Sequence, residues 1–572
     1  MNYIEVGLIV VILLVAAFFR LYRLNDIPPG LNNDEAFNLL DILRLLQGQF
    51  SIFFADNTGR EPFWFYLNTV TVALLGPQAL ALRATAAIIG TATIALVYGF
   101  ARALFRSIPV AALAALFTAI SIWHVVYSRY GLRIILAVPL TCLALWFFWR
   151  GLQSLRRRDF ILAGVFVAFG LYTYLSCRLV PFVLILLTAS AIVMNRARAI
   201  DYLKGLVIAG VVALVIFLPL GIYFVAHPDD FWGHTANLSI FDARVNQGNI
   251  STALWNNAVS VIGMFLVRGD HEGYRNVPNR PVFDPFLGTF FVIGAATLLF
   301  ALFTRRTSFD ARLRASLLAL WIIFFLLSSI TSDDAPSFLR TLPALPAVMM
   351  LAAWGVQSIW NRLCGSVTRT IAATIFAGGI IAGTGLGLRD YIEFGTSSLA
   401  YLAFDAHVTD TAQWINRNAR TSQVFIAPLW ARQGTLRVMT MDVPTKTYES
   451  RDSIVLPANT SGKDALMVYP WEQEKKADKL NERLGSLGTR EDLIGAAGFP
   501  VAVAIRIPAN NLPDAQNPLM ALNRGGEFVQ PQKTVRSALG DSIELLGYSI
   551  GATDPAKRNV EVTLFFHALN PG

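Results

Sequence analysis

The sequence predicts a polytopic α-helical membrane protein with about 11 transmembrane helices, followed by a C-terminal extracytoplasmic region of α/β and β structure. Of its 572 residues, 55% are hydrophobic and only 15% are charged, and the mean hydropathy is +0.51. Soluble proteins carry about 25% charged residues. Apolar runs of about 20 residues, long enough to cross a hydrocarbon core of ~30 Å, recur as far as residue 388. A soluble single domain is therefore excluded.

The predicted spans follow from these apolar runs. They cover residues 4–24, 79–101, 108–127, 134–152, 160–176, 179–194, 203–225, 285–303, 315–331, 342–360 and 370–388. The first run has no basic start and no small-residue cleavage site, so we interpret it as a retained helix and not as a signal peptide. The apolar stretch 62–76 is shorter, and we expect it to form an interfacial or re-entrant helix.

Loop arginines set the predicted orientation. One set of loops, which includes Arg102, Arg150, Arg196, Arg305 and Arg362, carries fifteen Lys and Arg residues, whereas the short loops opposite carry four. Cytoplasmic loops are enriched in basic residues, so the first set is predicted to be cytoplasmic. The N-terminus is then inside.

Three large pieces are consequently expected outside: the loop 25–76, the segment 226–284, and everything after residue 389. Arg20 and Arg23 disagree with the charge rule, because they lie at the outer end of the first helix. We expect a multi-pass protein of a bacterial cytoplasmic membrane with its C-terminal region extracytoplasmic.

Three regions are predicted along the chain: a transmembrane catalytic domain (1–388), an α/β domain (389–512) and a β-rich segment (513–572). Alternating helices and strands favour the α/β assignment. The expected helices are 405–419 and 472–487, and the expected strands are 424–429, 436–441, 465–469 and 501–507. Strands at 542–550 and 559–569 resemble those of a sandwich, and we expect this last module to be incomplete.

The most informative motif follows the first span and reads Pro28-Pro-Gly-Leu-Asn-Asn-Asp-Glu35. Asn33 is expected to cap a short helix that runs to about Leu46, with Asp34 and Glu35 in its first turn. Acidic residues there could merely complement the helix dipole. Beside the outer membrane lip, however, an ionisable group is a functional candidate, and we predict a catalytic role for this pair.

A second group of candidates consists of cationic residues close to the outer membrane surface, together with one acid. Arginine recognises phosphate through planar, bidentate hydrogen bonds. Snorkelling to lipid headgroups and surface ion pairing are the alternatives. Recurrence on the side that the charge rule disfavours points to an anion site. The residues are Arg60, Glu61, Arg129, Arg133, Arg178 and Arg340.

The segment 226–284 contains Asp270, His271 and Glu272, which could bind a cation, although their spacing matches no zinc signature. A solvated loop is the alternative. We name Glu61 and His271 as candidate ligands of a divalent cation, and we assume no metal because arginines can take its place. The sequence contains no P-loop, dinucleotide fingerprint or Gly-x-Ser-x-Gly elbow.

These motifs together resemble the GT-C class of membrane glycosyltransferases, in particular the protein O-mannosyltransferases and the lipid A aminoarabinose transferases. One N-terminal span followed by the loop with Asp34 and Glu35 is the main point of similarity. The resemblance covers roughly residues 1–400. Further support comes from Arg60-Glu61-Pro62, from Tyr172-Thr-Tyr with Arg178 and Pro181, and from Arg340 with Pro343 and Pro346.

The resemblance implies transfer of a sugar from a polyprenyl-phosphate donor to a hydroxyl of a protein, lipid or glycan. It implies that Asp34 is the acid/base candidate with Glu35 beside it, and that Glu61 shapes the site. The external arginines would hold the donor phosphate, and a single base opposite the leaving group predicts inversion. Many members of the class have an acid in the second outer loop, whereas residues 127–133 here carry only arginines.

Two other classes of function remain open from the sequence. A lipid or glycan flippase or transporter would be expected to carry charges within its spans, and mid-span Asp, Glu and Lys are nearly absent. A membrane-anchored glycan-binding protein would leave the region of Asp34 without a role. Nucleic acid is not an expected partner, because the basic excess is loop arginine.

Overall fold

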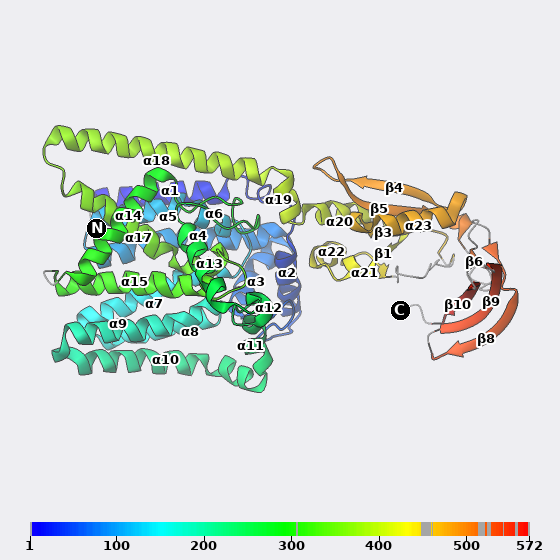
Figure 1. The fold of residues 1–572 in the computed structure, drawn as a ribbon, viewed down its shortest axis with the longest axis horizontal. Coiled ribbons are helices and arrows are strands. Elements are labelled where there is room, and N and C mark those ends of the chain that lie inside the picture. Colours follow the sequence, from blue (N-terminus) through cyan, green and yellow to red (C-terminus); the bar gives the residue numbers. More distant parts are fainter. Residues whose placement is uncertain are drawn as a thin grey trace. The chain divides into compact units, whose positions relative to one another are not determined.

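The computed structural model divides into two compact units, Met1–Phe404 and Asp405–Gly572 (Figure 1). It describes residues 3–304, 307–447, 459, 461–512, 521–522, 528–541, 543–554 and 559–569. The first unit holds the membrane helices and the second holds the sheets. The domain boundary expected at residue 388 lies inside helix α18 (Ser366–Gly395), and the units instead divide after Phe404.

Within the described residues, nine helical segments are long and apolar enough to cross a membrane. They contain α1 (Tyr3–Leu21), α4 (Ala79–Phe105), α7 (Ile134–Ser154), α9 (Val180–Met194), α10 (Ala199–Ala226), α14 (Pro285–Phe303), α15 (Phe309–Ile330), α17 (Leu345–Trp360) and α18. A tenth span is formed if α5 (Ile108–Ile120) and α6 (Ile122–Ser128), which meet at a bend of 59°, count as one.

The one remaining predicted span, 160–176, corresponds to α8 (Arg157–Leu171), which has only 15 residues. It packs along α7 and α10, side by side with them (Figure 1). The stretch 62–76 forms α3 (Phe63–Leu75), a helix of 13 residues. At about 1.5 Å per residue, this helix is too short to cross the hydrocarbon core.

The segments of the first unit that are predicted to lie outside also fold into short helices. The loop after α1 contains α2 (Asn33–Leu46), and the turn before α17 contains α16 (Phe338–Thr341). The segment 226–284 contributes α11 (Pro228–Asn237), α12 (Ala243–Asn246) and α13 (Ile250–Gly263), and α19 (Ser398–Ala403) ends the unit.

Arg20, which disagreed with the charge rule, is not a cation at the membrane surface. Its side chain is fully buried and donates to the carbonyls of Ala16 and Ala119, at 2.9 and 3.1 Å. Its Nη2 lies 2.6 Å from Nδ1 of His124 in α6. The arginine thus binds carbonyl groups near the end of α1 and at the α5–α6 bend. This structural role explains why its position does not follow the charge rule.

The second unit is built on a five-stranded sheet of order β2-β1-β3-β5-β4. Strands β1 (Ser422–Ile426), β2 (Thr445–Thr447) and β3 (Asp464–Pro470) are parallel. Strand β5 (Pro500–Ile507) pairs antiparallel with β3, and β4 (Thr489–Ile494) pairs antiparallel with β5. The helices are α20 (Ala406–Asn418), α21 (Pro428–Ala431), α22 (Gly434–Met439) and α23 (Glu474–Leu484).

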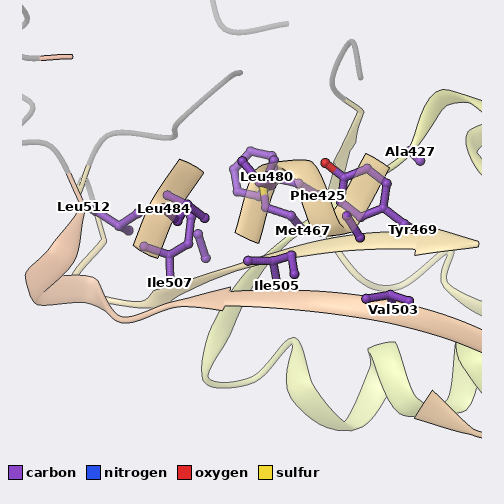
Figure 2. Packing of buried hydrophobic residues seen from close by; sticks show 12 residues of the cluster. Phe425, Ala427, Met467, Tyr469, Leu480, Leu484, Val503, Ile505, Ile507 and Leu512 are labelled. Atoms are coloured by element: carbon purple, nitrogen blue, oxygen red, sulfur yellow. The ribbon is translucent and has the colours of Figure 1, made fainter. Parts of the chain in front are cut away.

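One apolar core lies between this sheet and α23. Leu480 and Leu484 of the helix pack against Met467 of β3 and Val503 and Ile505 of β5 (Figure 2). Because β3 and β5 are central strands, their residues are buried almost throughout. The predicted strands 424–429, 465–469 and 501–507 therefore correspond to β1, β3 and β5.

One predicted strand is wrong. Residues 436–441 were expected to be extended, but the chain forms α22 instead. The side chain of Gln433 accepts a hydrogen bond from the backbone N–H of Leu436 at 3.0 Å and so caps the helix. Strands β2 and β4, which the sequence analysis did not identify, complete the sheet.

The C-terminal segment contains a three-stranded antiparallel sheet of order β10-β9-β8. Its strands are β8 (Lys533–Leu539), β9 (Ile543–Asp554) and β10 (Asn559–Ala568), and a separate short pair is formed by β6 (Ala521–Leu522) and β7 (Phe528–Val529). The predicted strands 542–550 and 559–569 match β9 and β10. The start of the predicted segment, 513–520, lies outside the described residues.

Candidate active site

The cap of α2 determines which acid of the Asp34–Glu35 pair faces inward. Asn32, and not Asn33 as expected, is the N-cap: its Oδ1 accepts from the backbone N–H of Asp34 at 2.9 Å. In return, the backbone N–H of Asn32 donates to Glu35 at 3.3 Å, which completes a capping box. Asn33 is therefore the first helical residue, Glu35 is fully buried, and Asp34 stays half-buried.

Glu35 is an anchor between segments, and its role differs from the catalytic one predicted. Arg83 of α4 donates to both of its oxygens, at 2.9 and 2.7 Å, and the backbone N–H of Gly131 donates at 2.9 Å. The same guanidinium donates to the carbonyls of Pro28 and Gly30. These bonds occupy the carboxylate, so it has no capacity left for a substrate.

The sequence analysis missed Arg83 because it lies inside a predicted span. Its position near the start of that span was the available signal, since a charged group in an apolar helix needs a partner. The pair is almost completely buried, with side-chain exposures of 1% for Arg83 and 0% for Glu35.

Asp34 has a different environment. Its Oδ1 accepts a hydrogen bond from Nδ2 of Asn57 at 3.1 Å. Among the described residues, no donor is bonded to Oδ2. Burial raises the pKa of Tyr274, and the nearby carboxylate of Asp34 adds to that increase. Burial also lowers the pKa of Arg60 to about 10, which the charges of Asp41 and Asp34 counteract. Asp34 thus keeps one oxygen for a ligand.

Glu61 lies between two arginines without a tight bond to either. Its side chain is buried, and its oxygens lie 3.7 Å from Nη2 of Arg133 and 3.8 Å from Nη2 of Arg178. Both distances exceed those of a hydrogen bond, and Oε2 has no hydrogen-bond partner in the described part of the chain. Two cations therefore face one acid, which leaves net positive charge and unused donors.

Aromatic rings hold these two arginines in place. The guanidinium of Arg133 lies 5.4 Å from the ring centroid of Tyr174, and that of Arg178 lies 4.0 Å from the centroid of Phe231. Each also donates to a backbone carbonyl: Arg133 to that of Gly59 at 3.4 Å, and Arg178 to that of Phe231 at 3.2 Å. A cation over a ring face is attracted without losing its hydrogen-bond donors, so both remain able to bind an anion.

Arg340 and Arg275 bring two more guanidinium groups to the same place, each of them paired with an aspartate. Arg133, Arg340, Arg275 and Glu61 all act electrostatically on the hydroxyl of Tyr174. Arg340 is paired with Asp333 at 3.2 Å, and Arg275 forms an ion pair with Asp334. Burial opposes the charged form of Arg275, but Tyr274 and Asp334 raise its pKa above the usual value.

The sequence analysis also missed Arg275, Tyr274 and Tyr127. Asp270 is fully buried and accepts from the backbone N–H of Phe338 at 2.8 Å, which ties this part of the 226–284 segment to the turn that carries Arg340. Tyr127 is fully buried, and its hydroxyl has no partner among the described residues. The aromatic residues around the outer arginines in the sequence could have indicated both tyrosines.

Two of the arginines that were predicted to bind phosphate donate their hydrogen bonds to other groups of the protein. The nitrogens of Arg129 donate to the carbonyls of Phe19 and Ile27 and to the hydroxyl of Tyr391, at 2.9, 2.7 and 3.1 Å. Arg60 donates at 2.8 Å to Asn38 and at 2.5 Å to Asp41, both in α2. We therefore assign these two arginines to holding the outer loop, and not to the donor phosphate.

The described residues contain no group of three His, Cys, Asp or Glu side chains that could hold a metal ion. Of the two candidate ligands, Glu61 faces arginines and His271 pairs with Glu272 at 3.4 Å, with its side chain half exposed.

Residues 59–223 match the family model of dolichyl-phosphate-mannose-protein mannosyltransferases. No curated protein sequence matches the chain. Among solved structures, ArnT from Cupriavidus metallidurans bound to undecaprenyl phosphate has a TM-score of 0.57 at 14% identity, with 90% of this chain and 99% of that one covered.

An archaeal oligosaccharyltransferase, AglB from Archaeoglobus fulgidus in complex with an inhibitory peptide and a dolichol-phosphate, has a TM-score of 0.51 at 15% identity. That match covers 90% of this chain and 78% of the other. The fold that the resemblance implies is confirmed: the chain shares the fold of these ArnT and AglB structures, and its segment 59–223 matches the family model of dolichyl-phosphate-mannose-protein mannosyltransferases.

Proposed function

We propose that this chain is an integral-membrane glycosyltransferase that moves a sugar from a polyprenyl-phosphate donor to a hydroxyl acceptor at the outer face of the membrane. The observation that carries the proposal is the pair Arg133 and Arg178, which face Glu61 across 3.7 and 3.8 Å. The structurally similar ArnT and AglB structures hold undecaprenyl phosphate and dolichol-phosphate, respectively. Their fold supports the same donor class here.

The arginine pair suits a phosphate that enters from the bilayer. Neither guanidinium is committed to a short bond with Glu61, so each can turn its N–H groups to phosphate oxygens. Arginine matches these oxygens with two parallel N–H donors. Arg340 is the third proposed ligand, because it lies near the same Tyr174 hydroxyl. We propose that the lipid tail stays in the membrane while these cations hold the phosphate.

The proposed reaction is a single displacement. The acceptor oxygen forms a bond to the anomeric carbon while the bond from that carbon to the phosphate oxygen breaks, and the phosphate leaves with the electron pair. Cations placed at the leaving oxygen stabilise its developing charge. Oδ2 of Asp34 accepts the proton of the acceptor hydroxyl. Attack opposite the leaving group inverts the anomeric carbon.

The proposal also covers the acceptor and a possible divalent cation. A hydroxyl of a protein, lipid or glycan would serve as acceptor. A divalent cation, if used, would need oxygen ligands from the substrate, because the described residues supply no set of three. The fold and the family match support a transferase, and nothing in them supports a flippase.

Release of polyprenyl phosphate from a panel of polyprenyl-phosphate hexoses and pentoses tests the function. The full chain, reconstituted in vesicles, should release the lipid phosphate from at least one donor only when an acceptor extract is present. Movement of the intact donor across the bilayer without release would instead show a flippase, and binding without either event would show a glycan-binding protein.

The sidedness of the site has its own test. We expect residues 390–572 and the loop 25–60 to be extracytoplasmic, by the charge rule. An impermeant thiol reagent should label Ser461→Cys but not Thr307→Cys in intact cells, after Cys364 is replaced by Ser. The reverse labelling pattern would contradict both the topology and the proposed access of the donor.

A further inference from the structure

The turn opposite Asp34 has an unusual backbone. Asn57, Thr58 and Gly59 follow one another with φ of 51°, 70° and 82°. Asn and Gly tolerate the left-handed region, but a β-branched residue such as Thr58 rarely adopts it. At Gly59, an added Cβ would lie 2.8 Å from the ring of Phe53. Such backbone conformations persist only where the surroundings enforce them, and they concentrate at functional sites.

The surroundings of this turn come from α2, the helix that carries Asp34. The two ends of the turn are joined by two backbone hydrogen bonds between Phe54 and Arg60, at 3.0 and 2.7 Å. Arg60 is then held by Asn38 and Asp41 of α2. On the other flank, Asp56 pairs with Arg44 of α2 at 2.7 Å. Asp34 and the turn therefore share one rigid support.

The strained conformation has one visible consequence: it presents the side-chain amide of Asn57 to Asp34. Nδ2 donates to Oδ1 at 3.1 Å. An N–H donor stabilises the ionised carboxylate, and the fixed Oδ1 leaves Oδ2 as the oxygen that can take a proton. The half-buried position of both residues limits competition from water.

We propose that Asn57 is a positioning residue, which orients the carboxylate of Asp34 so that its Oδ2 acts as the base. This inference rests on the proposed function. Asn57 itself touches neither donor nor acceptor in this account. The chemical requirement is a side chain with an N–H donor that also accepts a left-handed backbone, and among the common residues Asn fulfils both conditions.

Three variants separate orientation from stability. Asn57→Gly removes the amide and keeps the backbone conformation, and Asn57→Asp keeps the shape but replaces the donor by a second carboxylate. Thr58→Gly is the matched control, because it relaxes the backbone and leaves the amide in place. Arg60 and Tyr274, which interact electrostatically with Asp34, and Asp56 with its partner Arg44 are unchanged in all three.

The measurement is the dependence of kcat on pH, with KM for the donor and the melting temperature recorded alongside. Asn57→Gly should lower kcat about tenfold at unchanged KM, since a hydrogen bond to a charged group is lost. Its acid limb should move to higher pH, because the ionised form of Asp34 loses support. Asn57→Asp should move this limb further through like-charge repulsion. Thr58→Gly should keep the wild-type profile with an equal or higher melting temperature.

Unchanged pH profiles in both Asn57 variants, with only the melting temperature lowered, would overturn the inference. If that result accompanies an inactive Asp34→Asn enzyme, the proposed base stands and only the role of Asn57 falls. If Asp34→Asn stays active, the proposed mechanism fails first and the inference fails with it.

Discussion

Two buried carboxylates between α1 and α3, those of Glu35 and Glu61, both face arginine, but their bonds differ. Glu35 binds Arg83 at 2.7 and 2.9 Å and accepts two backbone N–H groups, those of Asn32 and Gly131. Glu61 stands 3.7 and 3.8 Å from Arg133 and Arg178, and its Oε2 has no hydrogen-bond partner within the described residues. The first arrangement is complete, and the second has capacity for a ligand.

An acid beside an arginine can therefore be a structural ion pair or part of a binding site. The two cases are distinguished by whether the hydrogen-bonding capacity of the acid and the arginine is already used. A saturated buried pair fixes the segments around it, and removing one partner leaves a buried charge. A cluster of arginines with unused N–H donors costs stability, because the like charges repel one another. Such clusters are typical of functional sites, where a bound anion offsets the repulsion. The two places should therefore respond differently to substitution.

The largest effect is expected at the complete pair. Glu35→Gln should reduce the free energy of unfolding by about 3–5 kcal/mol, because Arg83 stays buried without its counter-charge. Thermal unfolding of the purified chain in detergent measures the change. The double variant Glu35→Gln with Arg83→Met should recover part of the loss. A folded, equally stable Glu35→Gln protein would show that the pair is not the anchor described above.

The arginines at Glu61 should show the opposite pattern. Arg133→Lys and Arg178→Lys keep the charge but lose the two-donor geometry, so affinity for polyprenyl phosphate should weaken by about 1–3 kcal/mol. The melting temperature should change little, because neither arginine forms a short ion pair. Titration with undecaprenyl phosphate in nanodiscs gives the affinity. Unchanged affinity in both variants would remove them from the donor site.

The smallest effect is expected at Arg129, which the sequence placed with the phosphate ligands and the structure places among carbonyls. Arg129→Lys loses some of three hydrogen bonds, each worth about 0.5–1.5 kcal/mol. Stability should fall by an amount of that order, and affinity for undecaprenyl phosphate should remain as in the wild type. Weaker lipid binding without a change in stability would return Arg129 to the site.

The sequence predicted the fold correctly where a pattern of residues is compatible with only one kind of secondary structure. Apolar runs predicted the spans, and the continuous apolar strands 465–469 and 501–507 were correctly identified because central strands are buried on both faces. Residues 436–441 were misassigned, because a short amphipathic segment fits either a strand or one helical turn and the cap from Gln433 decides.

The site residues show a different limit. The candidates Asp34, Glu61, Arg133, Arg178 and Arg340 were singled out because the charge rule disfavours arginines in those short loops and because an ionisable group beside the membrane is a functional candidate. Their roles stay predictions. Their division from Glu35, Arg60 and Arg129 depends on partners far away in the chain, such as Arg83 and Tyr391. No local pattern contains that information, because each partner lies on another helix.

The most direct test of the account is Asp34→Asn, which preserves the shape of the side chain and removes its ability to accept a proton. Turnover should fall by at least ~10²-fold, which is the usual contribution of a positioned general base. Undecaprenyl phosphate affinity and melting temperature should stay at wild-type values, since an acid in the first turn contributes only ~0.3–1 kcal/mol through the helix dipole. Near-normal turnover together with a lowered melting temperature would contradict the account.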